Sequence, residues 1–175
     1  MTTQDQVNTP PAEGETSITL PNIYVALTDA PLDILSIMDK VRSPEAGAIV
    51  TFAGTTRNNF ASKPVHSLTY TSYRPLALQT LSSIASTLFT KHSLKGIAIV
   101  HRLGTVPIGE ESILIAVSSA HRKAAWLAGE EALEECKEKV EVWKREEFED
   151  GGVWRANRDG VQGVKVEGGR NILAN

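Results

Sequence analysis

The sequence predicts a single α+β domain with a mixed sheet. Segments with the alternation or β-branched content of strands are interspersed with three segments of helical periodicity, in the order β-α-β-β-α-β-β-α-β. The length of 175 residues suits one domain with tails, and the hydrophobic content of 41% is that of a globular protein. We expect a disordered N-terminal extension over residues 1–20, the folded domain over 21–156, and a glycine-rich C-terminal tail over 157–175.

The first elements follow from alternation and helix signals. Ile23–Thr28 places apolar residues on one face and predicts a strand. A helix is predicted from Asp29 onward, with Pro31 in its first turn, and Ser43-Pro44 ends it. Gly47–Thr55 is dense in small and β-branched residues, which indicates a buried strand leading into a polar loop.

The middle of the chain predicts three strands around one helix. His66–Tyr73 is expected to be a strand, and Pro75–His92 carries apolar residues at helical spacing. Gly96–Leu103 and Ser112–Ser119 are expected to be strands that flank a turn region rich in glycine and proline.

The last predicted elements are the longest helix and a short strand. Ala120–Lys139 is predicted to be helical, and Val140–Glu147 a short strand. Asp150-Gly-Gly indicates a turn before Val153–Arg155.

Composition excludes several classes of function. The net charge of −3 argues against a general nucleic-acid binder. The single cysteine, Cys136, rules out a disulfide framework and is interpreted as structural. The four histidines lack metal-binding spacing, so a metal site is not expected. We also expect no other cofactor. The polar N-terminus and the absence of a long apolar run predict a soluble, cytosolic protein.

Two lysines are the candidate acid/base groups. Lys137 and Lys144 lie on either side of a short segment that includes Trp143. Lysines at the rim of a fold bind anions, and a desolvated lysine can transfer a proton. The structural alternative is a solvated run of charge. Trp126 and Trp143 could stack on a flat heterocycle, but isolated tryptophans are usually core residues, so we assign them no function.

Three further basic clusters end predicted strands. Arg57 follows Gly47–Thr55 and suits recognition of phosphate or carboxylate, or else ties down its loop through backbone carbonyls. His121 and Arg122 open the longest helix, where amide groups favour anions, although a serine N-cap beside an incidental basic pair is the alternative. His101-Arg102 ends another strand, and we favour a structural role for this pair.

The spacing of these residues constrains the site. Sixteen residues of helix separate His121 from Lys137 by roughly 24 Å. One small ligand therefore cannot touch both within one protomer. Either they serve different sites, or a two-fold dimer brings one protomer's His121-Arg122 to its partner's Lys137. We favour the dimer.

At these residues the chain resembles the large, catalytic subunit of molybdopterin synthase. The similarity spans about Ile23 to Trp154. The matching motifs are Gly47-Ala-Ile-Val-Thr-Phe-Ala-Gly-Thr-Thr-Arg-Asn58, Val100-His-Arg-Leu-Gly104 with Gly109-Glu110, Ser118-Ser-Ala-His-Arg122, and Lys137 through Trp143-Lys-Arg-Glu146.

The resemblance implies an α/β hammerhead-type fold and a dimer of large subunits. Each would bind one small ubiquitin-like subunit, giving a heterotetramer. The implied reaction adds two sulfurs, carried as a thiocarboxylate on the small subunit's C-terminal Gly-Gly, to cyclic pyranopterin monophosphate (precursor Z), forming the molybdopterin dithiolene. The resemblance makes Lys137 and Lys144 the active-site lysines, which also bind substrate.

The remaining residues carried over by the resemblance bind substrate: Arg57, His121, Arg122, Arg145 and Glu146. Within this reading, Lys137 is the principal acid/base group and Lys144 binds and polarises the substrate. The main alternative is a non-catalytic scaffold that binds the C-terminal tail of a ubiquitin-like protein. An unrelated phosphate-binding enzyme is disfavoured by the absence of glycine-rich phosphate loops.

Overall fold

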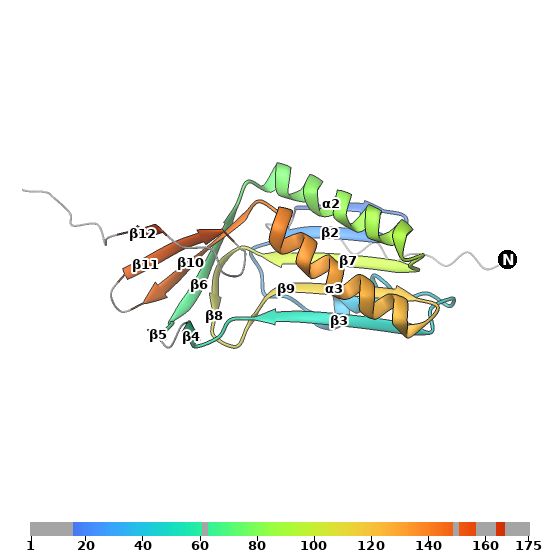
Figure 1. Cartoon of the computed structure of the whole chain (residues 1–175), viewed down its shortest axis with the longest axis horizontal. Helices are drawn as coiled ribbons and strands as arrows, with labels where there is room; N and C mark the ends of the chain where they lie inside the picture. The colour runs from blue at the N-terminus through green and yellow to red at the C-terminus, as the bar shows by residue number, and fades with distance from the viewer. Residues whose placement is uncertain (1–15, 61–62, 149–150, 157–163, 167–175) are drawn as a thin grey trace, which may run out of the picture.

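The computed structural model describes residues 16–60, 63–148, 151–156 and 164–166. Its larger body is a mixed five-stranded sheet in the order β1-β2-β7-β9-β3 (Figure 1). Only β2 and β7 run parallel, and the other neighbours are antiparallel. These strands are β1 (Thr16–Leu20), β2 (Ile23–Thr28), β3 (Ala48–Thr55), β7 (Gly96–Arg102) and β9 (Glu111–Ser119).

Helices cover both faces of this sheet. Figure 1 shows α2 (Arg74–Lys91) and α3 (Arg122–Lys139) side by side over one face. On the opposite face, α1 (Ile34–Asp39) and the residues after it pack Ile37 and Val41 against the small residues of β7 and β9. Because both faces are covered, every residue of β7 is buried.

A second five-stranded sheet is antiparallel and has the order β12-β11-β10-β6-β8. It lies at one end of the first sheet, next to the end of α3 that leads into β10 (Figure 1). Its strands are β6 (Ser67–Ser72), β8 (Gly104–Pro107), β10 (Val142–Phe148), β11 (Gly151–Ala156) and β12 (Val164–Val166). The short β4 (Asn59–Phe60) and β5 (Lys63–Pro64) pair with each other.

The predicted α+β class is confirmed, with one correction to the sheet. The strands expected at 66–73 and 140–147 do not join the mixed sheet but pair with each other as β6 and β10. The segment predicted as a turn after Gly96–Leu103 is partly a strand, β8, which pairs with β6. Gly104 and Gly109 both have positive φ, which glycine adopts without strain, and they bracket this strand.

Residues 16–20 correct the predicted disordered extension. They form β1, which pairs along its whole length with β2, and Ile18 packs against the main core. The strand was missed because it lies at the edge of the sheet and most of its residues are exposed. In the predicted tail, Val164–Val166 forms β12, whereas residues 1–15, 157–163 and 167–175 lie outside the described residues, as does Asp150 of the predicted turn.

The first helix and the strand after it also differ from expectation. The helix begins at Ile34, because the side chain of Asp33 accepts a hydrogen bond from the Leu35 amide at 2.9 Å and caps it there. Pro31 therefore precedes the helix. The strand β3 is not buried as predicted, because it is an edge strand whose residues are all partly or fully exposed.

The other predicted elements are confirmed to within about two residues, the usual uncertainty of element ends. Across the described ranges, no helix is long and apolar enough to cross a membrane. The cytosolic location stays a prediction.

Candidate active site

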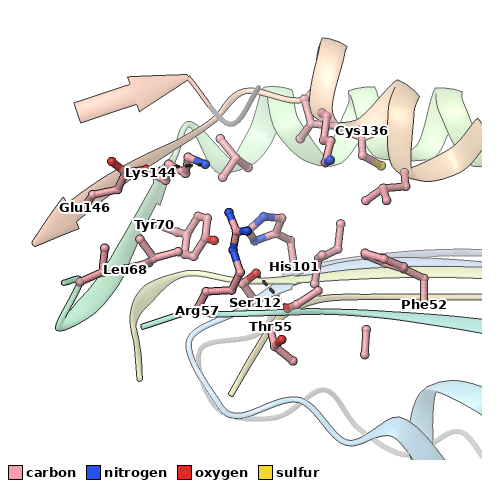
Figure 2. Close-up of a pocket in the computed structure, with 18 of the residues that line it drawn as sticks. Phe52, Thr55, Arg57, Leu68, Tyr70, His101, Ser112, Cys136, Lys144 and Glu146 are labelled. Carbon is pink, nitrogen blue, oxygen red and sulfur yellow. Dashed lines mark hydrogen bonds and ion pairs between the residues drawn. The ribbon is translucent and has the colours of Figure 1, made fainter. Parts of the chain in front are cut away.

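A cavity of about 460 Å³ lies where the two sheets meet the C-terminal end of α3 (Figure 2). Its floor comes from β3, β7 and β9 of the first sheet, and its wall from β6 and β10 of the second. Its charged and hydrogen-bonding lining residues include Arg57, Tyr70, His101, Ser112, Lys137, Lys144 and Glu146. The cavity therefore gathers three of the predicted basic residues from three separate elements.

Strand β10 supplies Lys144 and Glu146. Lys144 is opposite Tyr70 in the register of β10 with β6, so both side chains lie on the cavity face of the second sheet. Glu146, only 1% exposed, lies between two cations. Its Oε2 accepts a hydrogen bond from Arg155 Nε at 3.1 Å, and its Oε1 is 4.0 Å from Lys144 Nζ. Glu146 thus holds Lys144 at the cavity by charge attraction.

The last turn of α3 supplies Lys137, which lines the cavity beside Cys136. Burial raises the pKa of the Cys136 thiol to about 12, and the nearby Glu135 carboxylate adds to the effect. The thiol is therefore protonated at neutral pH, and the interpretation of Cys136 as a buried core residue is confirmed.

Arg57 reaches the cavity from the loop after β3. The structural alternative was a hydrogen bond from its side chain to a backbone carbonyl, and among the described residues the side chain makes no such bond. Its position is braced through the preceding Thr56, whose amide donates to the Glu110 carbonyl at 3.0 Å and whose carbonyl accepts from the Gly109 amide at 2.9 Å. Two backbone hydrogen bonds thus join the Arg57 loop to the turn after β8.

Arg102 secures the same turn. Its Nη1 donates to Glu110 Oε2 at 2.6 Å, and its Nη2 donates to the Thr105 carbonyl at 3.3 Å. These contacts agree with the structural role favoured for Arg102, which stays a prediction. His101, its neighbour in sequence, instead lines the cavity, so the pair divides between the two roles.

Tyr70, His101 and Ser112 form the part of the cavity where the sheets meet. The rings of Tyr70 and His101 contact edge to face with centroids 5.0 Å apart. Ser112 Oγ donates to the Gly54 carbonyl at 3.2 Å. Burial raises the pKa of Tyr70, the hydrogen bond with Ser112 opposes that shift, and the Glu146 charge adds to it. Tyr70 is therefore a neutral phenol.

Three predicted substrate-binding residues lie outside this cavity. His121 and Arg122 are exposed at the other end of α3, as the helix length requires. Arg145 lies on the opposite face of β10, where its guanidinium is 6.0 Å from the Trp154 ring and covers Gly152. Within one protomer, Arg145 therefore does not reach a ligand in this cavity.

The start of α3 also settles the serine alternative. Ser118 Oγ donates to the Val41 carbonyl at 2.6 Å, and Ser119 Oγ donates to the His121 carbonyl at 2.7 Å. The N-cap residue is His121, and its side chain makes no capping hydrogen bond. The interpretation of a serine N-cap is therefore wrong.

The two tryptophans were expected to be core residues, and this expectation is wrong. Trp126 is 64% exposed on α3, and Trp143 is 44% exposed on β10. Neither lines the cavity.

Sequence reasoning missed Tyr70, Ser112 and Arg155. Tyr70 and Ser112 lie within predicted strands, but nothing local showed which face would meet the cavity. Arg155 reaches Glu146 through the β10–β11 pairing, which places Lys144 opposite Arg155. The pairing of β10 with β11 could have revealed Arg155, because its register places residues 144, 146 and 155 on one face of the sheet.

The site suits an anionic ligand. Arg57, Lys137 and Lys144 offer hydrogen-bond donors and positive charge, in a cavity whose apolar wall includes Phe52, Leu81 and Val142. Among the described residues, no group of three or more histidine, cysteine or acidic side chains could hold a metal ion. The chemistry open to these side chains is anion binding, charge stabilisation and proton transfer.

Comparisons with known proteins agree on one family. A family model described as MoaE protein matches residues 27–139. A molybdopterin synthase catalytic subunit from Neurospora crassa is 73% identical over 154 residues, which cover 87% of this chain and 75% of that protein. One from Aspergillus niger is 59% identical over 149 residues, covering 84% of this chain and 83% of the relative.

Solved structures share the fold. A molybdopterin synthase structure from Staphylococcus aureus superposes with a TM-score of 0.71 and 35% identity, covering 74% of this chain and 94% of the other. A complex of subunits 1 and 2 of molybdopterin-converting factor from Helicobacter pylori contains a chain with a TM-score of 0.62 and 20% identity. That match covers 73% of this chain and 87% of the other, and the likeness shows the fold alone.

Proposed function

We propose that this chain, which belongs to the MoaE protein family, is the catalytic subunit of a molybdopterin synthase and acts in molybdenum cofactor biosynthesis. It transfers sulfur from the C-terminal thiocarboxylate of a small ubiquitin-like subunit to cyclic pyranopterin monophosphate. The observation that carries this proposal is the convergence of Arg57, Lys137 and Lys144 on one cavity, because these residues come from a loop, a helix end and a strand.

The cationic side chains of the cavity bind the phosphate of the substrate. The cyclic phosphate carries negative charge and offers only acceptors, so it pairs with guanidinium and ammonium groups. Lys144, held by buried Glu146, is a fixed donor that binds and polarises the substrate. Because Glu146 is buried and paired with Arg155, its role in substrate binding is indirect. Glu146 positions Lys144, which binds the substrate.

The reaction requires three bond changes per sulfur. The thiocarboxylate sulfur attacks an electrophilic carbon of the pterin, where the new carbon–sulfur bond replaces a carbon–oxygen bond and leaves a thioester to the small subunit. For one sulfur the displaced oxygen leaves as water, and for the other it stays on the phosphate, whose ring opens. Water then cleaves the acyl–sulfur bond, which leaves a carboxylate on the small subunit and a thiolate on the pterin. Lys137, at the cavity wall, transfers the proton in this hydrolysis, and the neighbouring cations stabilise the developing negative charge. The second sulfur follows in the same way, with opening of the cyclic phosphate.

The partners follow from the geometry of transfer. A small subunit delivers its C-terminal Gly-Gly into the cavity, so the cavity must admit both an extended peptide end and the pterin. We further propose that this chain forms a two-fold dimer, in which His121 and Arg122 of one protomer complete the cavity of its partner. With two small subunits, the assembly is a heterotetramer.

A reconstitution tests the function. The chain is mixed with precursor Z and a small subunit that bears either a thiocarboxylate or an ordinary carboxylate, and molybdopterin is measured as its fluorescent oxidation product. Product should form only with the thiocarboxylate. A stable complex with the small subunit that yields no product would favour the scaffold that binds the tail without catalysis.

Mixed dimers test the shared site. His121→Ala and Lys137→Ala proteins are each expected to be nearly inactive, but a dimer with one of each has one cavity with both residues intact. Random mixing makes half of the dimers mixed, so activity should recover to about one quarter of wild type. No recovery, with exchange of protomers verified, would contradict a cavity shared across the dimer.

A further inference from the structure

Glu141 lies in the short link between the two elements that carry the lysines of the cavity. Helix α3 ends at Lys139 and β10 begins at Val142, so only two residues separate them. Val140 and Val142 line the cavity, whereas the side chain of Glu141, between them, contacts α2. The link therefore presents its apolar side chains to the cavity and its carboxylate to the neighbouring helix.

Two hydroxyl groups from outside the link hold Glu141. Thr80 Oγ1 on α2 donates to the Glu141 carboxylate, with distances of 2.9 Å to Oε2 and 3.2 Å to Oε1. Ser72 Oγ, at the end of β6, donates to the Glu141 carbonyl at 2.8 Å, and Ser72 is opposite Val142 in the register of β6 with β10. Figure 1 shows β6 leading into α2 beside the place where α3 leads into β10. Glu141 thus ties the link to both β6 and α2 at the point where the chain changes from helix to strand.

The elements that carry the two lysines are held in different ways. Lys144 belongs to a strand that is paired on both sides, and Glu146 attracts its ammonium group. Lys137 belongs to the last turn of α3, beyond Cys136, which is the last buried residue of that helix. Helix ends fray when nothing outside the helix holds them. The contacts of Glu141 therefore affect the position of Lys137 more than that of Lys144.

We propose that Glu141 is a positioning residue for Lys137: by binding Thr80 and Ser72, it holds the last turn of α3 where Lys137 reaches the acyl–sulfur bond. The inference rests on the proposed function and adds to it, because it identifies what fixes the proton-transferring lysine relative to the bound substrate. The alternative is that these hydrogen bonds only add stability to the fold. The two roles differ in how the loss of Glu141 changes the rate of the chemical step.

Three variants test the contact between Glu141 and Thr80. Glu141→Ala removes the acceptor, Thr80→Val removes the donor but keeps the shape of its side chain, and Glu141→Gln keeps an amide oxygen that can accept from Thr80. The rate of molybdopterin formation is measured in single turnovers of the complex with thiocarboxylated small subunit and precursor Z. Glu141→Ala and Thr80→Val should each react about tenfold more slowly, as expected for one hydrogen bond to a charged group, and Glu141→Gln should stay within about threefold of wild type. The half-saturating concentration of precursor Z should change by less than about twofold, because Lys144 keeps its place.

A control and a double-variant cycle show whether Glu141 acts through Lys137. Thr87→Val is the matched control, because Thr87 is exposed two turns beyond Thr80 on the same helix, and it should react like wild type. In the Lys137→Ala protein, Glu141→Ala should cause no further loss of rate, because residues that act as a unit are not additive. An equal loss from Glu141→Ala with and without Lys137, or wild-type rates in both Glu141→Ala and Thr80→Val, would overturn the inference.

Amide hydrogen exchange gives a readout that does not depend on the reaction. The Val140 amide donates to the Cys136 carbonyl at 3.1 Å and closes the last turn of α3. In Glu141→Ala this amide should exchange about tenfold faster than in wild type or in Thr87→Val. Unchanged exchange at Val140 would overturn the inference, because the turn would then open without breaking the contacts of Glu141. A wild-type complex that forms no molybdopterin would instead contradict the proposed function, and the exchange result would still decide whether Glu141 holds this turn.

Discussion

Replacing Glu146 with glutamine tests the anchoring of Lys144. The substitution keeps the shape of the side chain and removes its charge, which leaves Arg155 and Lys144 as partly buried cations with no carboxylate between them. Their side chains are 20% and 16% exposed, so solvent screens them weakly. Breaking a buried ion pair by removing one partner costs about 3–5 kcal/mol. For a chain of this length such a loss lowers Tm by roughly 10 °C.

The assay is urea denaturation of Glu146→Gln beside a matched control. Glu135→Gln removes the carboxylate of the Lys139–Glu135 pair, whose side chains are 50% and 29% exposed. An exposed pair spaced by four residues on a helix contributes only about 0.3–0.5 kcal/mol. A further cycle with Arg155→Gln measures the coupling between Glu146 and Arg155 directly. If Glu146→Gln costs no more than Glu135→Gln, the account of a buried carboxylate that positions Lys144 is refuted.

Three further predictions concern the cavity and its support. Because burial lowers the pKa of His101 to about 4, the unfolded chain gains a proton below pH 6.5 that the folded chain does not. As the pH falls from 7.5 to 5, the free energy of unfolding should therefore decrease by about 2 kcal/mol because of His101. In urea denaturation at these two pH values, His101→Asn should not show this decrease. The same pH dependence of the free energy of unfolding in the variant and in wild type would contradict the burial argument. Glu110→Gln should loosen the turn that braces Arg57 and raise KM for precursor Z more than it lowers kcat, since the ion pair with Arg102 is lost. An unchanged KM would mean that the backbone hydrogen bonds of Thr56 suffice. Gly54→Val should lower stability and activity together, because even a Cβ would lie 2.8 Å from the Ile113 side chain beneath the cavity; normal thermal unfolding would contradict this.

The sequence predicts the fold class and most elements because their signals are local. Helical spacing identifies α2 and α3, and alternation identifies β2, within a residue or two of the observed bounds. The partition of strands into two sheets is not local. Strand β10 pairs with β6 across more than sixty residues of chain, and no pattern in either segment specifies that partner. Strand β3 is dense in β-branched residues like a buried strand, yet it lies at an edge.

The sequence predicts those site residues whose side-chain type by itself indicates their chemistry. Arg57, Lys137 and Lys144 stand out as basic residues at element ends, and all three line one cavity. Arg145 follows Lys144 directly but lies on the other face, because side chains alternate along a strand. The roles of His101 and Arg155 depend on tertiary contacts, and spacing alone does not reveal those contacts. The predicted participation of His121 and Arg122 stays a prediction that concerns the dimer.

The most direct test of the central claim is single-turnover sulfur transfer by Lys137→Ala. The variant is loaded with thiocarboxylated small subunit and precursor Z, and Lys139→Ala is the matched control, since Lys139 pairs with Glu135 on the same helix and does not line the cavity. We expect Lys137→Ala to bind both partners but to form molybdopterin at least a hundredfold more slowly, because a general acid/base group is lost. Lys139→Ala should react like wild type. Full turnover by Lys137→Ala would contradict the assignment of the catalytic proton transfer to Lys137.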